Sequence, residues 1–261
     1  MKNFNFKSAS NTKEAIKLVS SKATFLAGGM TLLPAIKLRL AAYTDLINIK
    51  KIKSLSGIKV SSKSLKIGAT TTHAEVAVSK EVGKSISSLA ILAESIGDPQ
   101  VRNRGTIGGS IANNDPAADY PSACLALNAT IHTNKRKIPA NKFFKEMFET
   151  DLKKGELIES VEFEVPEKSA YAKFPNPASR YALVGVYVAK LKNEVRVAVT
   201  GVESCVFRCK KLEDILSKNF SSSAIDDVNI SSKGFNVDIH ASAEYRAHII
   251  KVMAKKAISS C

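Results

Sequence analysis

Residues 101–121 are rich in glycine, asparagine and aspartate and carry only scattered apolar side chains. This composition predicts a long structured loop rather than a regular helix or strand. A loop of that length inside a compact domain is either functional or disordered, and the interspersed Ile107, Ile111 and Ala112 argue against disorder. We therefore expect this segment to have a binding function.

The sequence GTIGGS, residues 105–110, lies at the centre of this segment. Its three glycines and two hydroxyls allow backbone amides and hydroxyl groups to bond a pyrophosphate with no bulky Cβ in the way. Asp119 follows and can accept both hydroxyls of a ribose, as acidic residues do in other dinucleotide sites. A helix N-cap before Pro121 is an equally good interpretation of Asp119. Arg102 and Arg104 flank the loop and can screen phosphate charge, although they are equally well explained as solvated surface charges.

A second glycine pair occurs earlier, in the sequence LAGGMTLL of residues 26–33. Two glycines between a strand and a helix leave free amides that can hold an anion. The pattern is neither a Walker loop nor the GxGxxG fingerprint of dinucleotide-binding folds. Taken alone, it is more often an ordinary tight turn.

The pattern of apolar residues predicts three parts. Within the first fifty residues, strands at 23–27 and 46–49 and helices after Asn11 and over 31–37 form a β-α-β-α-β unit. The pattern restarts at Gly57, with a strand at 65–69 and helices at 72–78 and 86–96, the last ended by Asp98-Pro99. The sequence thus predicts two small subdomains over 1–56 and 57–155.

The composition changes near residue 150. Strands are expected at 157–165, 182–192 and 195–202, and an amphipathic helix at 243–258. The sequence therefore predicts an α+β protein whose third domain, residues 156–261, combines an antiparallel sheet with helices.

Several classes of protein are excluded. The longest uninterrupted apolar stretch, 182–189, is far shorter than the roughly 20 residues that cross a bilayer, so no transmembrane helix is expected. The first residues lack an apolar signal core, which indicates a cytoplasmic protein. Four cysteines are too few and too scattered for a disulfide framework, and Cys205 and Cys209, the close pair, have no second pair with which to form a metal site.

The two glycine loops, the sequence IGATT at 67–71, residues 101–119 and the sequence ALVGV at 182–186 together resemble the FAD-binding medium subunit of molybdenum hydroxylases. Carbon monoxide dehydrogenase and xanthine dehydrogenase are members of that family. The resemblance runs over nearly the whole chain in the right order, and it implies a two-subdomain FAD-binding domain of the PCMH type followed by a C-terminal domain.

The resemblance also implies which residues bind FAD. The two glycine loops hold the pyrophosphate through backbone amides, Asp119 binds the ribose, and Lys173 lies near the cofactor. Ile96 corresponds to a residue on the flavin or adenosine side and Ile158 to an apolar backbone contact. The implied set is Leu26, Ala27, Gly28, Gly29, Met30, Thr31, Leu32, Leu33, Ile96, Thr106, Ile107, Gly108, Gly109, Ser110, Asp119, Ile158 and Lys173. Met30 stands where relatives often have a polar residue, so only its backbone is expected to contribute.

In this family a molybdopterin subunit oxidises the substrate and a small subunit passes the electrons through two [2Fe–2S] clusters to the flavin. The resemblance therefore implies an electron-transfer subunit in a dimer of heterotrimers, with NAD, a quinone or oxygen as external acceptor, and with no catalytic side chain of its own, because the flavin carries the redox chemistry.

Two alternatives stay open. A free-standing FAD-dependent oxidase would need its own substrate pocket and a covalent anchor for the flavin, and no His or Cys lies close to the glycine loops in sequence. A basic nucleic-acid-binding protein is suggested by the formal charge of +15. The basic residues are spread along the chain, however, and there is no Trp for stacking, so we expect no nucleic-acid partner.

Overall fold

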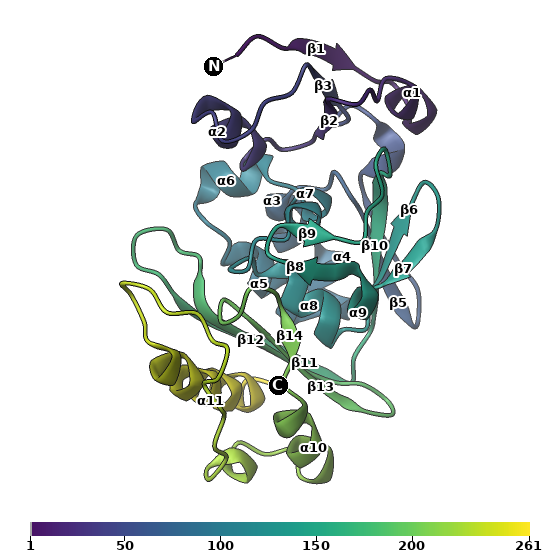
Figure 1. Ribbon diagram of the computed structural model, residues 1–261. Coiled ribbons are helices and arrows are strands. Elements are labelled where there is room, and N and C mark those ends of the chain that lie inside the picture. The colour runs from purple at the N-terminus through teal and green to yellow at the C-terminus, as the bar shows by residue number, and fades with distance from the viewer. Residues whose placement is uncertain (1) are drawn as a thin grey trace.

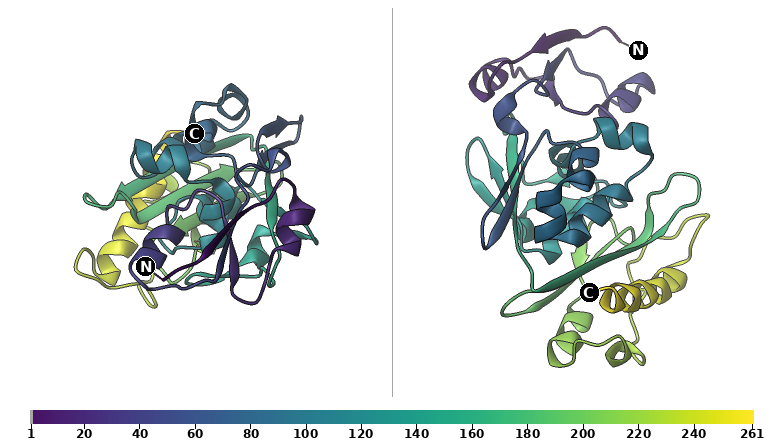
Figure 2. Two further views of the ribbon diagram at one scale, coloured as in Figure 1. Left: turned by 90° about the horizontal axis from the view of Figure 1, so that it is seen from above. Right: turned by 180° about the vertical axis from the view of Figure 1, so that it is seen from behind.

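The computed structural model describes residues 2–261, which form three parts that follow one another along the molecule (Figure 1). The N-terminal part lies at one end and the C-terminal part at the other, with the middle part between them, as the view from behind also shows (Figure 2, right). The α+β class expected from the sequence is confirmed.

The N-terminal part is a three-stranded parallel sheet in the order β1-β3-β2. Its elements are β1 (Asn5–Ser8), α1 (Thr12–Lys17), β2 (Ala23–Leu26), α2 (Leu32–Lys37) and β3 (Asp45–Asn48). Helix α1 begins at Asn11, whose side chain accepts a hydrogen bond from the amide of Glu14 at 2.9 Å. The predicted β-α-β-α-β unit is therefore present.

The middle part is built on a five-stranded antiparallel sheet in the order β4-β5-β10-β6-β7, with a small β8-β9 hairpin beside it. Its elements are η1 (Lys53–Leu55), β4 (Ile58–Val60), β5 (Ser64–Gly68), α3 (His73–Val78), α4 (Lys80–Ser85), α5 (Ser87–Glu94), α6 (Pro99–Arg104), α7 (Ile107–Asn113), α8 (Tyr120–Ala126), β6 (Thr130–Thr133), β7 (Lys137–Pro139), α9 (Ala140–Phe143), β8 (Phe144–Glu146), β9 (Glu149–Thr150) and β10 (Ile158–Glu164).

Strand β10 is the central strand of this sheet. Val161 pairs with Ile67 of β5 on one side and with Ile131 of β6 on the other. We expected this strand in the third domain, but its pairing makes it part of the middle sheet, because an alternating pattern predicts a strand and not its partners. We therefore propose that the third domain begins near residue 167 rather than at 156.

The segment 101–121 is not one long loop but is largely helical. Asp98 accepts from the amide of Val101 at 2.8 Å and, with Pro99 in the first turn, begins α6. Thr106 accepts from the amide of Gly109 at 3.2 Å and begins α7. Asp98 and Pro99 therefore start a helix, whereas the preceding helix α5 already ends at Glu94. Short helices with many glycines lack the apolar repeat that identifies a helix in sequence.

The C-terminal part is a four-stranded antiparallel sheet, β11-β12-β13-β14, with α10 and α11 on one face. Its elements are β11 (Lys168–Pro175), β12 (Ala182–Lys190), β13 (Val195–Thr200), β14 (Phe207–Arg208), α10 (Lys210–Lys218), η2 (Ser223–Ile225) and α11 (Ala243–Ser259).

Strand β12 is apolar throughout because both of its faces are covered. Val186 and Val188 pack in the core beneath α11, whereas the alternate residues Tyr187 and Ala189 pack in the core of the middle part, which includes residues of α5 and α8. Figure 1 shows the sheet lying between these two sets of helices. No helix among residues 2–261 combines the length and the apolar character needed to cross a membrane.

Candidate functional site

The two glycine loops lie in direct contact. Gly28 lies in the loop that follows β2. A Cβ added there would overlap the backbone carbonyl oxygen of Arg104 and lie 2.8 Å from the Cα of Gly105. Gly28 is glycine because the backbone of the middle part approaches this closely. The loops of two separate parts therefore form one continuous backbone surface.

The first loop has unused donors. Gly29 has a φ of +76°, and Thr31 begins α2 without a side-chain cap. Among residues 2–261, no backbone or side-chain acceptor takes a hydrogen bond from the amides of Gly28, Gly29, Met30, Thr31 and Leu32. Met30 and Thr31 are exposed, and Leu33 already donates to Gly29. This loop presents successive free N–H groups.

The second loop has used almost all of its donors. The amide of Ile107 donates to Thr71, that of Gly108 to Ala69 (2.9 Å), that of Gly109 to the hydroxyl of Thr106, and that of Ser110 to the carbonyl of Thr106. A Cβ on Gly108 would lie 2.6 Å from the Cβ of Ala69. The glycine at this position serves close packing against the middle sheet.

Asp119 is held by two side chains from β11. Its Oδ1 atom accepts from the hydroxyl of Tyr171 at 2.5 Å and lies 3.0 Å from Nζ of Lys173. The residue is 5% exposed. Although Asp119 precedes α8, its side chain makes no capping hydrogen bond. Burial raises the pKa of the Asp119 carboxyl, and the Lys173 ammonium opposes that shift.

Lys173 also connects Asp119 to the segment that contains Ile96. Its ammonium donates to the carbonyl of Ser95 at 2.8 Å. The guanidinium of Arg102 donates to the carbonyls of Ile96 (3.1 Å) and Gly97 (3.3 Å). Arg102 therefore shapes the turn after α5, and Ile96 is half-buried there.

Ile158 lies in the sheet rather than in a loop. It is the first residue of β10 and is 4% exposed. The next residue, Glu159, accepts from the amide of Ala69 at 2.9 Å, and the carbonyl of Ala69 accepts from Gly108. The start of β10 is thus connected to the second glycine loop by hydrogen bonds through Ala69.

The FAD-binding domain in molybdopterin dehydrogenase matches residues 2–167 of this chain. The chain belongs to this family.

Full-length relatives support this assignment. The glyceraldehyde dehydrogenase medium chain of Sulfolobus acidocaldarius is 35% identical, with 97% of this chain and 96% of that protein covered. The carbon monoxide dehydrogenase medium chain of Hydrogenophaga pseudoflava is 32% identical over 98% of this chain and 96% of that protein. The chain is thus the FAD-binding component of an oxidoreductase.

Two solved structures have the same fold. Carbon monoxide dehydrogenase from Hydrogenophaga pseudoflava gives a TM-score of 0.87 at 30% identity, covering 99% of this chain and 96% of that chain. Quinoline 2-oxidoreductase from Pseudomonas putida gives a TM-score of 0.89 at 26% identity, covering 100% of this chain and 98% of that chain. The expected family and cofactor are therefore confirmed.

The residues present fit FAD. The free amides of the first loop are donors of the kind that a pyrophosphate requires. The Oδ2 atom of Asp119 accepts from no other residue among 2–261, so it can accept from a ligand hydroxyl. Bound FAD supplies the redox chemistry, and this chain supplies donors, an acceptor and a rigid support.

Three residues of this region were assigned no role from the sequence: His73, Tyr120 and Tyr171. The rings of His73 and Tyr120 lie 5.3 Å apart, and His73 Nδ1 and the Tyr120 hydroxyl are buried with no hydrogen-bond partner among residues 2–261. Burial lowers the pKa of His73 to about 4, which keeps the ring neutral at pH 7. For Tyr171 a signal was available, because residues two apart on a strand share a face and Lys173 follows at that spacing.

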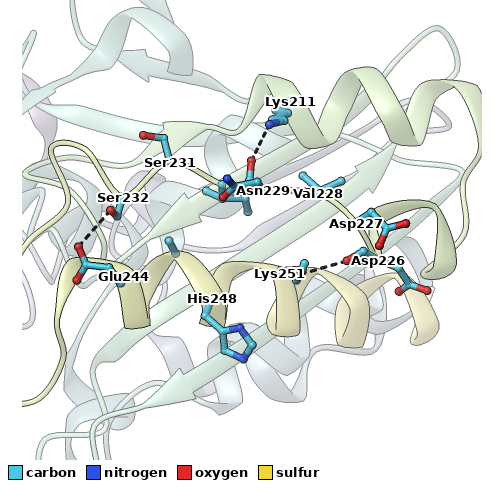
Figure 3. A pocket seen from close by; sticks show the side chains of 12 residues that line it. Lys211, Asp226, Asp227, Val228, Asn229, Ser231, Ser232, Glu244, His248 and Lys251 are labelled. Atoms are coloured by element: carbon cyan, nitrogen blue, oxygen red, sulfur yellow. Dashed lines mark hydrogen bonds between the residues drawn. The ribbon is translucent and has the colours of Figure 1, made fainter.

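A groove of about 840 Å³ lies in the C-terminal part, between α10, residues 226–232 and α11 (Figure 3). It is lined by charged and polar side chains that bond to nearby groups: Lys211 donates to the carbonyl of Asn229 at 2.6 Å and Lys251 to that of Asp226 at 3.1 Å. None of the residues assigned to the cofactor lines it. We assign the cofactor to the glycine loops instead.

The cysteines carry no metal site in the part of the chain that the structure describes. Cys209 is buried and Cys205 is half-buried against the side chain of Asn114, and both are free thiols. No cluster of three or more His, Cys, Asp or Glu side chains that could hold a metal ion occurs among residues 2–261.

Proposed function

We propose that this chain is the FAD-carrying electron-transfer subunit of a molybdenum hydroxylase. It receives electrons from the [2Fe–2S] clusters of a small subunit and delivers them to an external acceptor, NAD, a quinone or oxygen. The observation that carries the cofactor assignment is the run of free amides over Gly28–Leu32 in a chain whose family binds FAD.

Each part of the site has its own task in this proposal. The amides of the first loop bind the pyrophosphate, while the second loop, through its contact with Gly28, fixes the position of the first. The carboxyl group of Asp119 accepts a hydrogen bond from a hydroxyl of the cofactor, and the Lys173 ammonium opposes the rise in pKa that burial causes in that group. No side chain is assigned an acid–base role, because the chain's task is to bind the flavin and exclude other reactions.

The partners follow from the names of the relatives. The carbon monoxide dehydrogenase protein is called a medium chain, and a 31% identical protein of Paenarthrobacter nicotinovorans is a subunit of the 6-hydroxypseudooxynicotine dehydrogenase complex. We therefore propose a small iron–sulfur subunit and a large molybdopterin subunit as partners, assembled as a dimer of heterotrimers.

Purification of the tagged chain from its native cells tests the assembly. We expect two co-purifying subunits, a visible spectrum with flavin and iron–sulfur bands, about one FAD per chain, and molybdenum in the metal analysis. A chain that purifies alone with FAD and oxidises a small substrate would support a free-standing oxidase. A chain without FAD that also fails to take it up would contradict the proposal as a whole.

A further inference from the structure

Tyr171 makes a contact that neither the family nor the relatives' names explain. Its hydroxyl donates to Asp119 Oδ1 at 2.5 Å, across the boundary between β11 and the start of α8. Residues 168–175 lie outside the family match, which ends at residue 167. The acceptor proposed for the cofactor is thus held by a side chain of the C-terminal part.

The neighbouring strand leaves space for this hydroxyl. In the β11–β12 register, Lys173 is opposite Gly185 and Tyr171 is opposite Tyr187. A Cβ on Gly185 would overlap the Tyr171 hydroxyl. Gly185 lies within a strand and has no positive φ, so its backbone conformation does not require glycine. A glycine is needed there because a side chain would occupy the space of the Tyr171 hydroxyl.

Tyr171 and Lys173 contribute differently to the same carboxylate. Both approach Oδ1, but the Lys173 ammonium is shared with the carbonyl of Ser95. The phenol is rigid, with two side-chain torsions, whereas the ammonium is a point charge at the end of a flexible chain. A short O–H···O bond from a rigid ring therefore sets the orientation of the carboxyl group, while Lys173 places a positive charge beside it.

We propose that Tyr171 is a positioning residue for the cofactor: by occupying Oδ1 of Asp119, it directs Oδ2 to a hydroxyl of FAD. This inference rests on the proposed function, in which Asp119 accepts from the cofactor. Through Asp119, it gives Tyr171 of the C-terminal sheet an indirect part in cofactor affinity.

The test measures FAD affinity of the full chain after the flavin has been removed, by titration with FAD and fluorescence detection. Tyr171→Phe removes only the hydroxyl and should weaken FAD binding about tenfold, as expected for the lost orientation of one charged hydrogen bond. Tyr187→Phe is the matched control, because Tyr187 is the paired residue and its hydroxyl bonds to Ser88 at 2.6 Å instead of to a carboxylate. It should change the affinity less than twofold.

A double-mutant cycle with Asp119→Asn separates positioning from a structural role. If Tyr171 acts through the carboxylate, Tyr171→Phe should cost less than twofold in the Asp119→Asn background. An equal loss in both backgrounds, or no loss in the wild-type background, would overturn the inference. Gly185→Ala, which displaces the hydroxyl without removing it, should reproduce the Tyr171→Phe defect.

The controls separate this inference from the proposed function. If the wild-type chain takes up no FAD, the proposed function fails and Tyr171 is not the cause. If the wild type binds FAD and Tyr171→Phe binds it equally well, the positioning role alone fails. Thermal unfolding of each flavin-free variant identifies any loss of affinity that comes from misfolding.

Discussion

The first and second glycine loops resemble each other in sequence but differ in how their backbones are used. In the loop at Gly28 five successive amides have no acceptor among residues 2–261, whereas in the loop at Gly108 the chain itself accepts nearly every N–H. The glycines differ accordingly: Gly29 provides a left-handed turn, and Gly108 provides close packing on Ala69. A glycine-rich sequence therefore does not by itself show which backbone donors remain available to a ligand.

The largest effect should follow from breaking the contact between the two loops. Gly28→Ala forces a Cβ into the carbonyl of Arg104, and overpacking against backbone costs about 3 kcal/mol, so FAD binding should weaken roughly 100-fold. FAD titration measures this loss. Gly83→Ala is the matched control, because nothing lies within 4 Å of that position in α4. Equal FAD affinity of Gly28→Ala and wild type would show that the loop contact is unimportant.

Acid should lower the stability of the folded chain through His73, whose ring lies next to Gly105 of the second loop. The folded pKa of about 4 lies below the unfolded value of about 6.5, so as the pH falls the unfolded chain takes up a proton that folded His73 does not. This difference should lower the free energy of unfolding by about 2 kcal/mol at pH 5 relative to pH 7.5.

Urea denaturation at both pH values measures this effect. His73→Gln should remove this share of the pH dependence, while His240→Gln, at an exposed position, should keep it. A His73→Gln chain that loses stability with acid as steeply as wild type would contradict the assignment.

A smaller effect is expected from the cap of the second loop. Thr106→Ala removes the acceptor for Gly109 and should lower the free energy of unfolding by about 1 kcal/mol. Thr106→Ser keeps the acceptor and should be close to wild type. Chemical denaturation with FAD absent measures both, and a Thr106→Ala chain as stable as Thr106→Ser would argue that the cap contributes little.

The smallest effect on FAD affinity and stability should come from replacing the Met30 side chain in the first loop. Met30 is 37% exposed, and only its amide is assigned to the cofactor. Met30→Ala should change FAD affinity less than twofold and the free energy of unfolding by less than about 0.5 kcal/mol. Met30→Pro removes the amide donor at the same position, and a Met30→Pro chain that binds FAD like Met30→Ala would show that this amide is not used.

The sequence predicted both loops but not the difference between them. Glycine spacing shows where a backbone can approach a ligand, whereas the use of each amide depends on partners such as Ala69 and Thr71, which lie more than thirty residues away from Gly108 and Ile107. The same limit explains β10, whose alternation predicts a strand but not its place between β5 and β6.

The site residues divide in the same way. The family resemblance implies that Asp119 and Lys173 both lie at the cofactor, and in the structure Nζ of Lys173 lies 3.0 Å from Oδ1 of Asp119. Tyr171, two residues before Lys173, was assigned no role from the sequence, because strand alternation shows which residues share a face and not what that face contacts. The capping interpretation of Asp119 failed because tertiary partners from β11 satisfy the carboxylate instead.

The covered faces of β12 have a consequence for how such proteins can recombine. The sheet belongs to two cores at once, and the partners of Asp119 are on β11, beyond residue 167. An exchange between relatives that transferred only residues 2–167 would separate Asp119 from Tyr171 and Lys173 and pack α5 and α8 against another protein's version of β12. The unit of inheritance for this cofactor site is therefore longer than the family domain, and viable chimaeras should have their crossover points after β12.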